Sequence, residues 1–112
     1  MSVVSAYFIC GSREEAERIS TALVEERLAA CCNILGECHS IYRWDGAVER
    51  AAEVPVIAKT RSDMADALIA RVSEMHSYDN PAIVVWPIDR LPLDYARWVE
   101  NNSGNGPFSD TA

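Results

Sequence analysis

The chain has 112 residues and a formal net charge of −7, and 49% of its residues are hydrophobic. This length suits one domain with a single core, and the composition is ordinary for a soluble globular protein. The acidic charge argues against nucleic acid and anionic membrane surfaces, because both are bound through Lys and Arg. We therefore expect neither as a partner.

The N-terminus and the cysteines indicate the compartment. The sequence shows no run close to the roughly 20 apolar residues of a membrane span. The first residues, MSVVSAYFICGS, lack a basic segment, so they read as a first strand rather than a signal peptide. We therefore expect a cytoplasmic protein whose four cysteines are free thiols.

A strand and a helix are predicted first. Residues 3–10 are apolar and rich in β-formers, which predicts a strand buried on both faces. Ser12 and Glu15 have the spacing of a capping box, and apolar residues at helical spacing predict a helix over 13–29. Its acidic residues, Glu15 included, are expected on solvated faces.

A long hairpin is predicted next. Residues 31–44 and 46–60 are strand-like, and Asp45-Gly46 between them is a strong two-residue turn. The first strand should bend near Gly36. Pro55 has no N–H for a β-ladder, so the second strand must be an edge or carry a bulge there.

The C-terminal half predicts a helix, a strand and a last helix. Ser62 should cap a helix ending near His76, and residues 82–88 form a short apolar strand. A helix follows Leu91-Pro92. We expect a single domain over residues 1–101 and a disordered tail over 102–112.

The predicted order is β-α-β-β-α-β with an extra C-terminal helix. This order predicts an α+β, ferredoxin-like sandwich in which one antiparallel sheet carries both main helices on one face. The second face of the sheet then needs a cover. One short helix is too small for this, so we expect a partner subunit there.

Several motifs along residues 3–100 resemble the CutA family of divalent-cation tolerance proteins. They are the strand ending in Cys10, Leu28-Ala29-Ala30-Cys31 with Asn33, Ile41 to Gly46, Glu53 followed by Ile57 to Thr60, His76 to Pro81, and Asp94-Tyr95 with Trp98. The resemblance implies a ferredoxin-like homotrimer in which long hairpins extend a neighbour's sheet. It also implies a role in tolerance of copper and other divalent cations.

The hairpin aromatics agree with such an assembly. Tyr42 and Trp44 lie near the predicted hairpin tip, where a lone domain usually places polar residues. Long unpaired strands and exposed aromatic side chains both mark contact surfaces. We expect both aromatics to pack against another chain of a homotrimer.

The candidate metal ligands are Cys10, Met75 and His76. Cys10 ends the first strand and His76 ends the second helix, and their donor types suit Cu(I) or other soft ions. Alternatively, Cys10 and Met75 fill the core and His76 interacts with the helix dipole. Two departures from the family pattern, Met75 in place of a second histidine and Ser77 in place of proline, weaken the expectation of copper coordination. No metal is expected to be required for folding.

The second hypothesis is a small-ligand site at a cleft between subunits, as in signalling trimers of the PII type. Its candidate residues are Tyr42, Trp44, Glu53, Lys59 and Tyr78. Alternatively, Glu53 and Lys59 form an interface ion pair and the aromatics supply contact area. The sequence has no Gly-rich phosphate loop, nucleophile elbow or metalloprotease motif, so we expect no enzyme.

Overall fold

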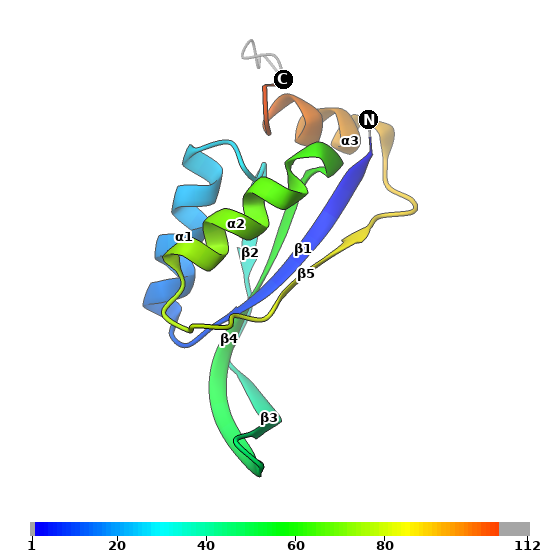
Figure 1. The fold of residues 1–112 in the computed structure, drawn as a ribbon. Helices are drawn as coiled ribbons and strands as arrows, with labels where there is room; N and C mark the ends of the chain where they lie inside the picture. Colours follow the sequence, from blue (N-terminus) through cyan, green and yellow to red (C-terminus); the bar gives the residue numbers. More distant parts are fainter. Residues whose placement is uncertain (1, 106–112) are drawn as a thin grey trace.

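The computed structural model describes residues 2–105, which form a five-stranded antiparallel sheet and three α-helices (Figure 1). In chain order the elements are β1 (Val3–Cys10), α1 (Arg13–Glu25), β2 (Cys31–Ile34), β3 (Cys38–Trp44), β4 (Ala47–Arg61), a 3-10 turn (Ser62–Met64), α2 (Ala65–Met75), β5 (Ile83–Pro87) and α3 (Leu93–Asn101). The strand order is β2-β4-β1-β5, with β3 also paired to β4. This confirms the predicted ferredoxin-like fold.

The helices α1 and α2 cover one face of the sheet, as predicted (Figure 1). The core between them includes Phe8, Ile19, Leu23, Val56 and Leu68, all fully buried. Burying one such side chain contributes about 1.5–3 kcal/mol. Strand β1 is buried through most of its length, since it runs between β4 and β5.

Both main helices differ slightly from their predicted bounds. Helix α1 ends at Glu25, because Arg27 adopts a left-handed conformation with φ of 62° that stops the helix. The N–H groups of Leu28 and Ala29 then donate to the carbonyl of Leu23. Ser62 begins the 3-10 turn, and α2 starts three residues later at Ala65.

The predicted hairpin forms a narrow arm that extends away from the helices (Figure 1). We call β3 with Ala47–Glu53 of β4 the arm, since these two segments pair only with each other among the described residues. Asp45 and Gly46 both have positive φ, 53° and 82°, as the two-residue turn requires.

Pro55 lies where the arm leaves the sheet. It pairs with Ile9 of β1 on one side, so β4 is an interior strand rather than an edge. On the other side, residues 35–37 face only Val54 and Pro55, and the register shifts by one residue between β2 and β3. The missing N–H of Pro55 therefore falls at a bulge, the second of the two predicted alternatives.

The C-terminal end is anchored by Arg27. Its guanidinium donates hydrogen bonds to the carbonyls of Asn101 (2.7 Å) and Gly104 (2.8 Å), and its own carbonyl accepts from the N–H of Gly104 (2.7 Å). Ser103 is fully buried. The folded domain thus extends past residue 101, where we expected a disordered tail, and residues 106–112 of that tail lie outside the described residues.

The sheet face opposite α1 and α2 keeps an apolar surface. Tyr7 stacks on Trp86 with ring centroids 6.2 Å apart, and Val84 and Trp86 are 52% and 45% exposed. Helix α3 packs near the end of the sheet, around Val3 and Ala30. Among the described residues, no helix is both long and apolar enough to span a membrane.

Candidate metal centre and its polar network

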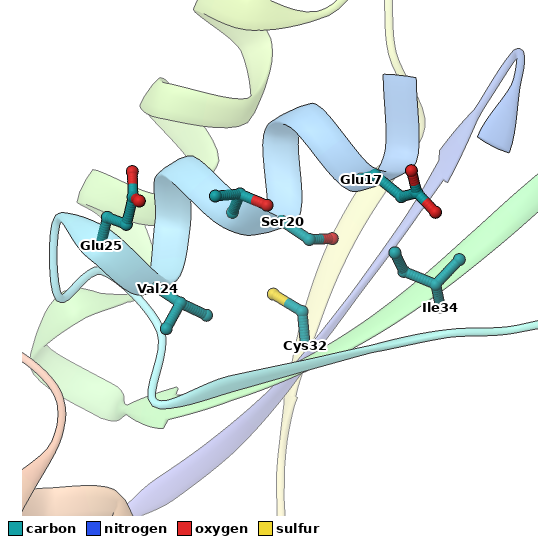
Figure 2. A pocket seen from close by; sticks show the side chains of 7 residues that line it. Glu17, Ser20, Val24, Glu25, Cys32 and Ile34 are labelled. Carbon is teal, nitrogen blue, oxygen red and sulfur yellow. The ribbon is translucent and has the colours of Figure 1, made fainter. Parts of the chain in front are cut away.

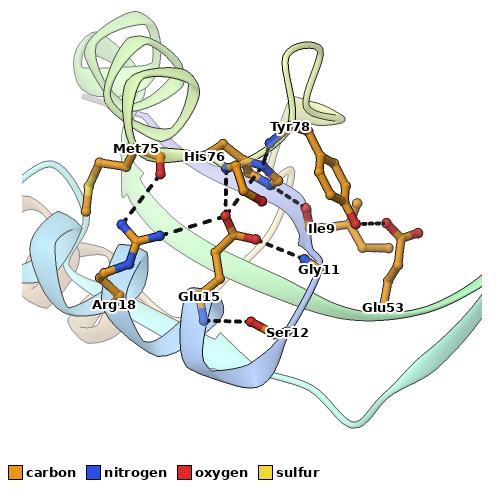
Figure 3. A network of polar contacts seen from close by, with 10 residues as sticks. Ile9, Gly11, Ser12, Glu15, Arg18, Glu53, Met75, His76 and Tyr78 are labelled. Atoms are coloured by element: carbon orange, nitrogen blue, oxygen red, sulfur yellow. Dashed lines mark hydrogen bonds and ion pairs between the residues drawn. The ribbon is translucent and has the colours of Figure 1, made fainter.

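Glu15 is central to the candidate site, although the sequence placed it on a solvated face. Ser12 caps α1 as predicted, accepting from the N–H of Glu15 at 3.1 Å. The Glu15 carboxylate, however, accepts from the N–H groups of Gly11 (3.0 Å) and Ser77 (2.7 Å) (Figure 3). Glu15 is only 6% exposed, so the prediction of a solvated side chain is wrong.

The carboxylate of Glu15 is held in its ionised form. Burial raises its pKa, and the hydrogen bonds from the N–H groups of Gly11 and Ser77 act in the opposite direction and lower it. The net result is a pKa below the ordinary value of 4.5. Arg18 adds an ion pair at 3.8 Å from its half-exposed position on α1.

His76 follows the last residue of α2, and its two ring nitrogens have different partners. Nε2 lies 2.7 Å from the carbonyl oxygen of Ile9, and Nδ1 accepts from the N–H of Tyr78 at 3.1 Å (Figure 3). A carbonyl can only accept, so Nε2 carries the proton and Nδ1 presents its lone pair. Nδ1 also faces the Glu15 carboxylate, 3.8 Å away.

Cys10 completes the cluster from the end of β1. Its side chain is fully buried, and this burial, with the nearby charge of Glu15, raises the pKa of the thiol to about 12. One donor atom each from Cys10, Glu15 and His76 lie within 4.8 Å of one another. We call these three residues the cluster.

The donor set of the cluster fits a copper or similar divalent cation. Thiolate, imidazole and carboxylate are ligands of such ions, and three ligand atoms spread evenly at 2.0–2.3 Å around one ion lie roughly 3.3–4.0 Å apart. The three donors, which lie within 4.8 Å of one another, therefore have to move closer together to share one ion. Binding also requires the Cys10 proton to leave and the lone pair of His76 Nδ1 to be released.

Met75, the third candidate from the sequence, lies outside this cluster. Its side chain points away from the contact between Glu15 and His76 and packs against the hydrophobic core (Figure 3). Its backbone carbonyl accepts from Arg18 at 3.5 Å. The cluster thus combines Cys10 and His76 with Glu15 rather than with Met75.

The residues considered for a cleft are only partly gathered within one chain. Tyr78 donates its hydroxyl to Glu53 at 2.8 Å, and Tyr42 lies close enough to contribute to the raised pKa of Tyr78, about 12, whose main cause is burial. Trp44 is 64% exposed near the arm tip. Lys59 lies six positions from Glu53 along β4, roughly 20 Å away, so the two do not pair in one subunit.

A separate groove of about 360 Å³ lies between α1 and β2 (Figure 2). Its lining residues are Glu17, Ser20, Thr21, Val24, Glu25, Cys32 and Ile34. Burial raises the pKa of the Cys32 thiol to about 11, although the adjacent Ser20 hydroxyl lowers it. With a single sulfur donor and no histidine among its lining residues, the groove is a weaker metal candidate than the cluster.

The family model described as "CutA1 divalent ion tolerance protein" matches residues 4–102. The chain belongs to the CutA1 divalent ion tolerance family. Among curated family members, it is 43% identical over 93 residues to a divalent-cation tolerance protein CutA of Thermus thermophilus, covering 83% of this chain and 90% of that one. It is 42% identical over 86 residues to a divalent-cation tolerance protein CutA of Pyrococcus horikoshii, and this match covers 77% of this chain and 83% of that one.

Family members from plants and mammals are longer. The chain is 35% identical over 100 residues to a chloroplastic CutA 1 of rice, covering 89% of this chain but 56% of that one. It thus spans about half to two thirds of the length of the plant and mammalian relatives it matches.

Solved structures of the family share the fold. The rice CutA1 crystal structure aligns with a TM-score of 0.91 at 33% identity, covering 95% of this chain and 97% of that one. The Thermus thermophilus structure aligns with a TM-score of 0.88 at 39% identity, covering 91% of this chain and 99% of that one.

Proposed function

We propose that the protein is a non-enzymatic, cytoplasmic homotrimer that supports divalent-cation tolerance by binding copper or another divalent cation, one ion per subunit. The observation that carries the metal site is the approach of three donor atoms from Cys10, Glu15 and His76 within 4.8 Å. Relatives are named for divalent-cation tolerance. Cytoplasmic location is supported by the four cysteines, all free within the described residues.

The surroundings of His76 support its role as a ligand. Metal-binding histidines usually donate their second ring N–H to a backbone carbonyl or carboxylate, which fixes the ring and its tautomer. The contact between Nε2 and the Ile9 carbonyl supplies this arrangement. It leaves Nδ1 as the ligand atom, on the side of Glu15.

The apolar side chains of the arm support the homotrimer. Ile41, Trp44 and Val48 are each more than 60% exposed, although a two-stranded hairpin has little stability of its own in water. Val84 and Trp86 extend the exposed apolar surface onto the sheet. Contacts with neighbouring subunits would bury both regions.

Metal binding can be tested by titrating the reduced protein with Cu(I) and with Zn²⁺ in separate series, each against a competing chelator. We expect one ion per subunit and at least a tenfold loss of affinity in Cys10→Ser, because losing even a residue that only supports a ligand usually costs about tenfold to a hundredfold. Cys32→Ser is the matched control, because Cys32 is another poorly exposed thiol with a raised pKa, placed outside the cluster. Equal affinity of Cys10→Ser and the wild type would remove the cluster as the site.

The alternative is a small-ligand or signalling trimer of the PII type. The observation in its favour is Glu53, a carboxylate only 8% exposed that Tyr78 holds at the base of the arm. This hypothesis expects saturable binding of a small ligand that Tyr42→Ala abolishes while the trimer persists. Binding that survives Tyr42→Ala would exclude this cleft.

A further inference from the structure

We propose that Tyr78 closes the metal centre, so that the strength of its hydrogen bond to Glu53 sets the affinity for the ion. This inference rests on the proposed metal function and adds a residue that controls it. The backbone N–H of Tyr78 donates a hydrogen bond to His76 Nδ1, and the hydroxyl of Tyr78 donates one to the Glu53 carboxylate (Figure 3).

The competition arises at a single lone pair. With the proton of His76 on Nε2, Nδ1 has one lone pair, and the N–H of Tyr78 uses it at 3.1 Å. An ion bound to Nδ1 must use the same lone pair. The ion and the N–H of Tyr78 therefore exclude each other at this atom.

Tyr78 cannot easily move its N–H alone, because its side chain is fixed as well. Its ring lies against the His76 ring, with centroids 4.7 Å apart. The hydroxyl donates to Glu53 at 2.8 Å, and the ring passes so close to Gly11 that a Cβ there would lie 3.0 Å from the hydroxyl oxygen. Releasing Nδ1 thus strains or breaks the bond to Glu53.

Glu53 connects this competition to the arm. It pairs with Cys38, the first residue of β3, at the point where the arm leaves the sheet. Two binding events that exclude each other weaken each other by the same factor. A bound ion should therefore loosen the contact between Tyr78 and Glu53, and loss of that contact should strengthen ion binding.

The test compares Tyr78→Phe with the wild type in the Cu(I) and Zn²⁺ titrations. This variant keeps the ring and the backbone N–H but removes the hydroxyl, so we expect binding about threefold to tenfold tighter, the usual worth of one hydrogen bond. Tyr95→Phe is the matched control, because its hydroxyl contacts Cys31 Sγ at 3.6 Å, away from the cluster, and it should leave the affinity unchanged.

A second readout follows Tyr78 directly in the wild type. Amide hydrogen exchange, measured by NMR, should be slow for the Tyr78 N–H in the metal-free protein and clearly faster once the ion saturates it. Equal affinity of Tyr78→Phe and the wild type, or unchanged exchange of this N–H at saturation, would overturn the role of Tyr78 while leaving metal binding intact. A wild type that binds neither ion would overturn the metal function and this inference together.

Discussion

The carboxylate of Glu15, in the first turn of α1, accepts a hydrogen bond of 2.7 Å from the backbone N–H of Ser77, just beyond the end of α2. The two residues are 62 positions apart in the sequence. One buried side chain thus joins the start of one helix to the end of the other. It also satisfies the N–H of Gly11, at the turn that leaves β1.

Glu15→Gln should lower the free energy of unfolding of the metal-free protein at pH 7 by about 1–3 kcal/mol, the cost of weakening buried charge-assisted hydrogen bonds. The folded-state pKa of Glu15 lies below its ordinary value of 4.5. Its stabilising effect is therefore complete above that ordinary value and is lost as the pH falls through the folded-state pKa.

Urea unfolding between pH 7 and pH 3 would measure this effect. The stability difference between the wild type and Glu15→Gln should be constant from pH 7 to about pH 5 and shrink at lower pH. Glu14→Gln is the control, since Glu14 is exposed in the same helical turn. A difference that does not change with pH would show that the ionised carboxylate is not the source.

Trp44→Ala should weaken the proposed homotrimer. Truncating an interface aromatic can cost 2 kcal/mol or more, which is about a thirtyfold change in an equilibrium constant. Leu93→Ala is a closely matched control, because Leu93 on α3 is also 64% exposed but lies far from the arm. Sedimentation or native mass spectrometry would show the result, and a variant that assembles as tightly as the wild type at nanomolar concentration would contradict the proposed packing.

Arg27→Ala should destabilise the C-terminal end by about 2 kcal/mol, because it removes two charge-assisted hydrogen bonds to the carbonyls of Asn101 and Gly104. Amide exchange in α3 should accelerate more than exchange in α1 or the core strands. Arg90→Ala, at a fully exposed arginine, is the control. Uniform acceleration across the chain would indicate a global rather than a local role.

Cys10 should resist alkylation in the native protein. With a thiol pKa of about 12, only about one Cys10 side chain in 10⁴ is a thiolate at pH 8, and burial restricts access further. Iodoacetamide labelling followed by mass spectrometry should modify the partly exposed Cys31 and Cys38 before the buried Cys10. Labelling in denaturant should remove the difference, and equal native rates would contradict the buried position of Cys10.

Local sequence signals predicted the fold well. The turn at Asp45-Gly46 fixed the hairpin, and the helical spacing of apolar residues located α1 and α2. The end of α1 was not predicted, because Arg27 adopts a left-handed conformation there. This conformation is usually adopted by glycine and only occasionally by asparagine or aspartate. Hydrogen bonds from Arg27 to residues 74 and 77 positions away stabilise that conformation, and the residues around Arg27 in the sequence do not predict these bonds.

The candidate site was less predictable, since its geometry depends on contacts between distant segments. Cys10 and His76 were predicted from their donor types and from their positions at the ends of the first strand and the second helix, and Met75 was included as a soft donor next to His76. Glu15 was overlooked because a capping-box glutamate usually reaches only its own helix terminus. Here one of its oxygens binds the N–H of Ser77, a partner that only the packed helices define.

The single strand that joins the arm to the sheet has a consequence for how the protein folds. Beyond Glu53 the arm has no partner within the described chain, and a lone hairpin is marginally stable in water. In the proposed homotrimer its order would come from the neighbouring subunits, so folding of the arm would be coupled to association, whereas folding of the core would be unimolecular. At high dilution the arm should lose its structure while the rest of the domain stays native. Protein concentration would then control the local order of the arm, as temperature and denaturant do.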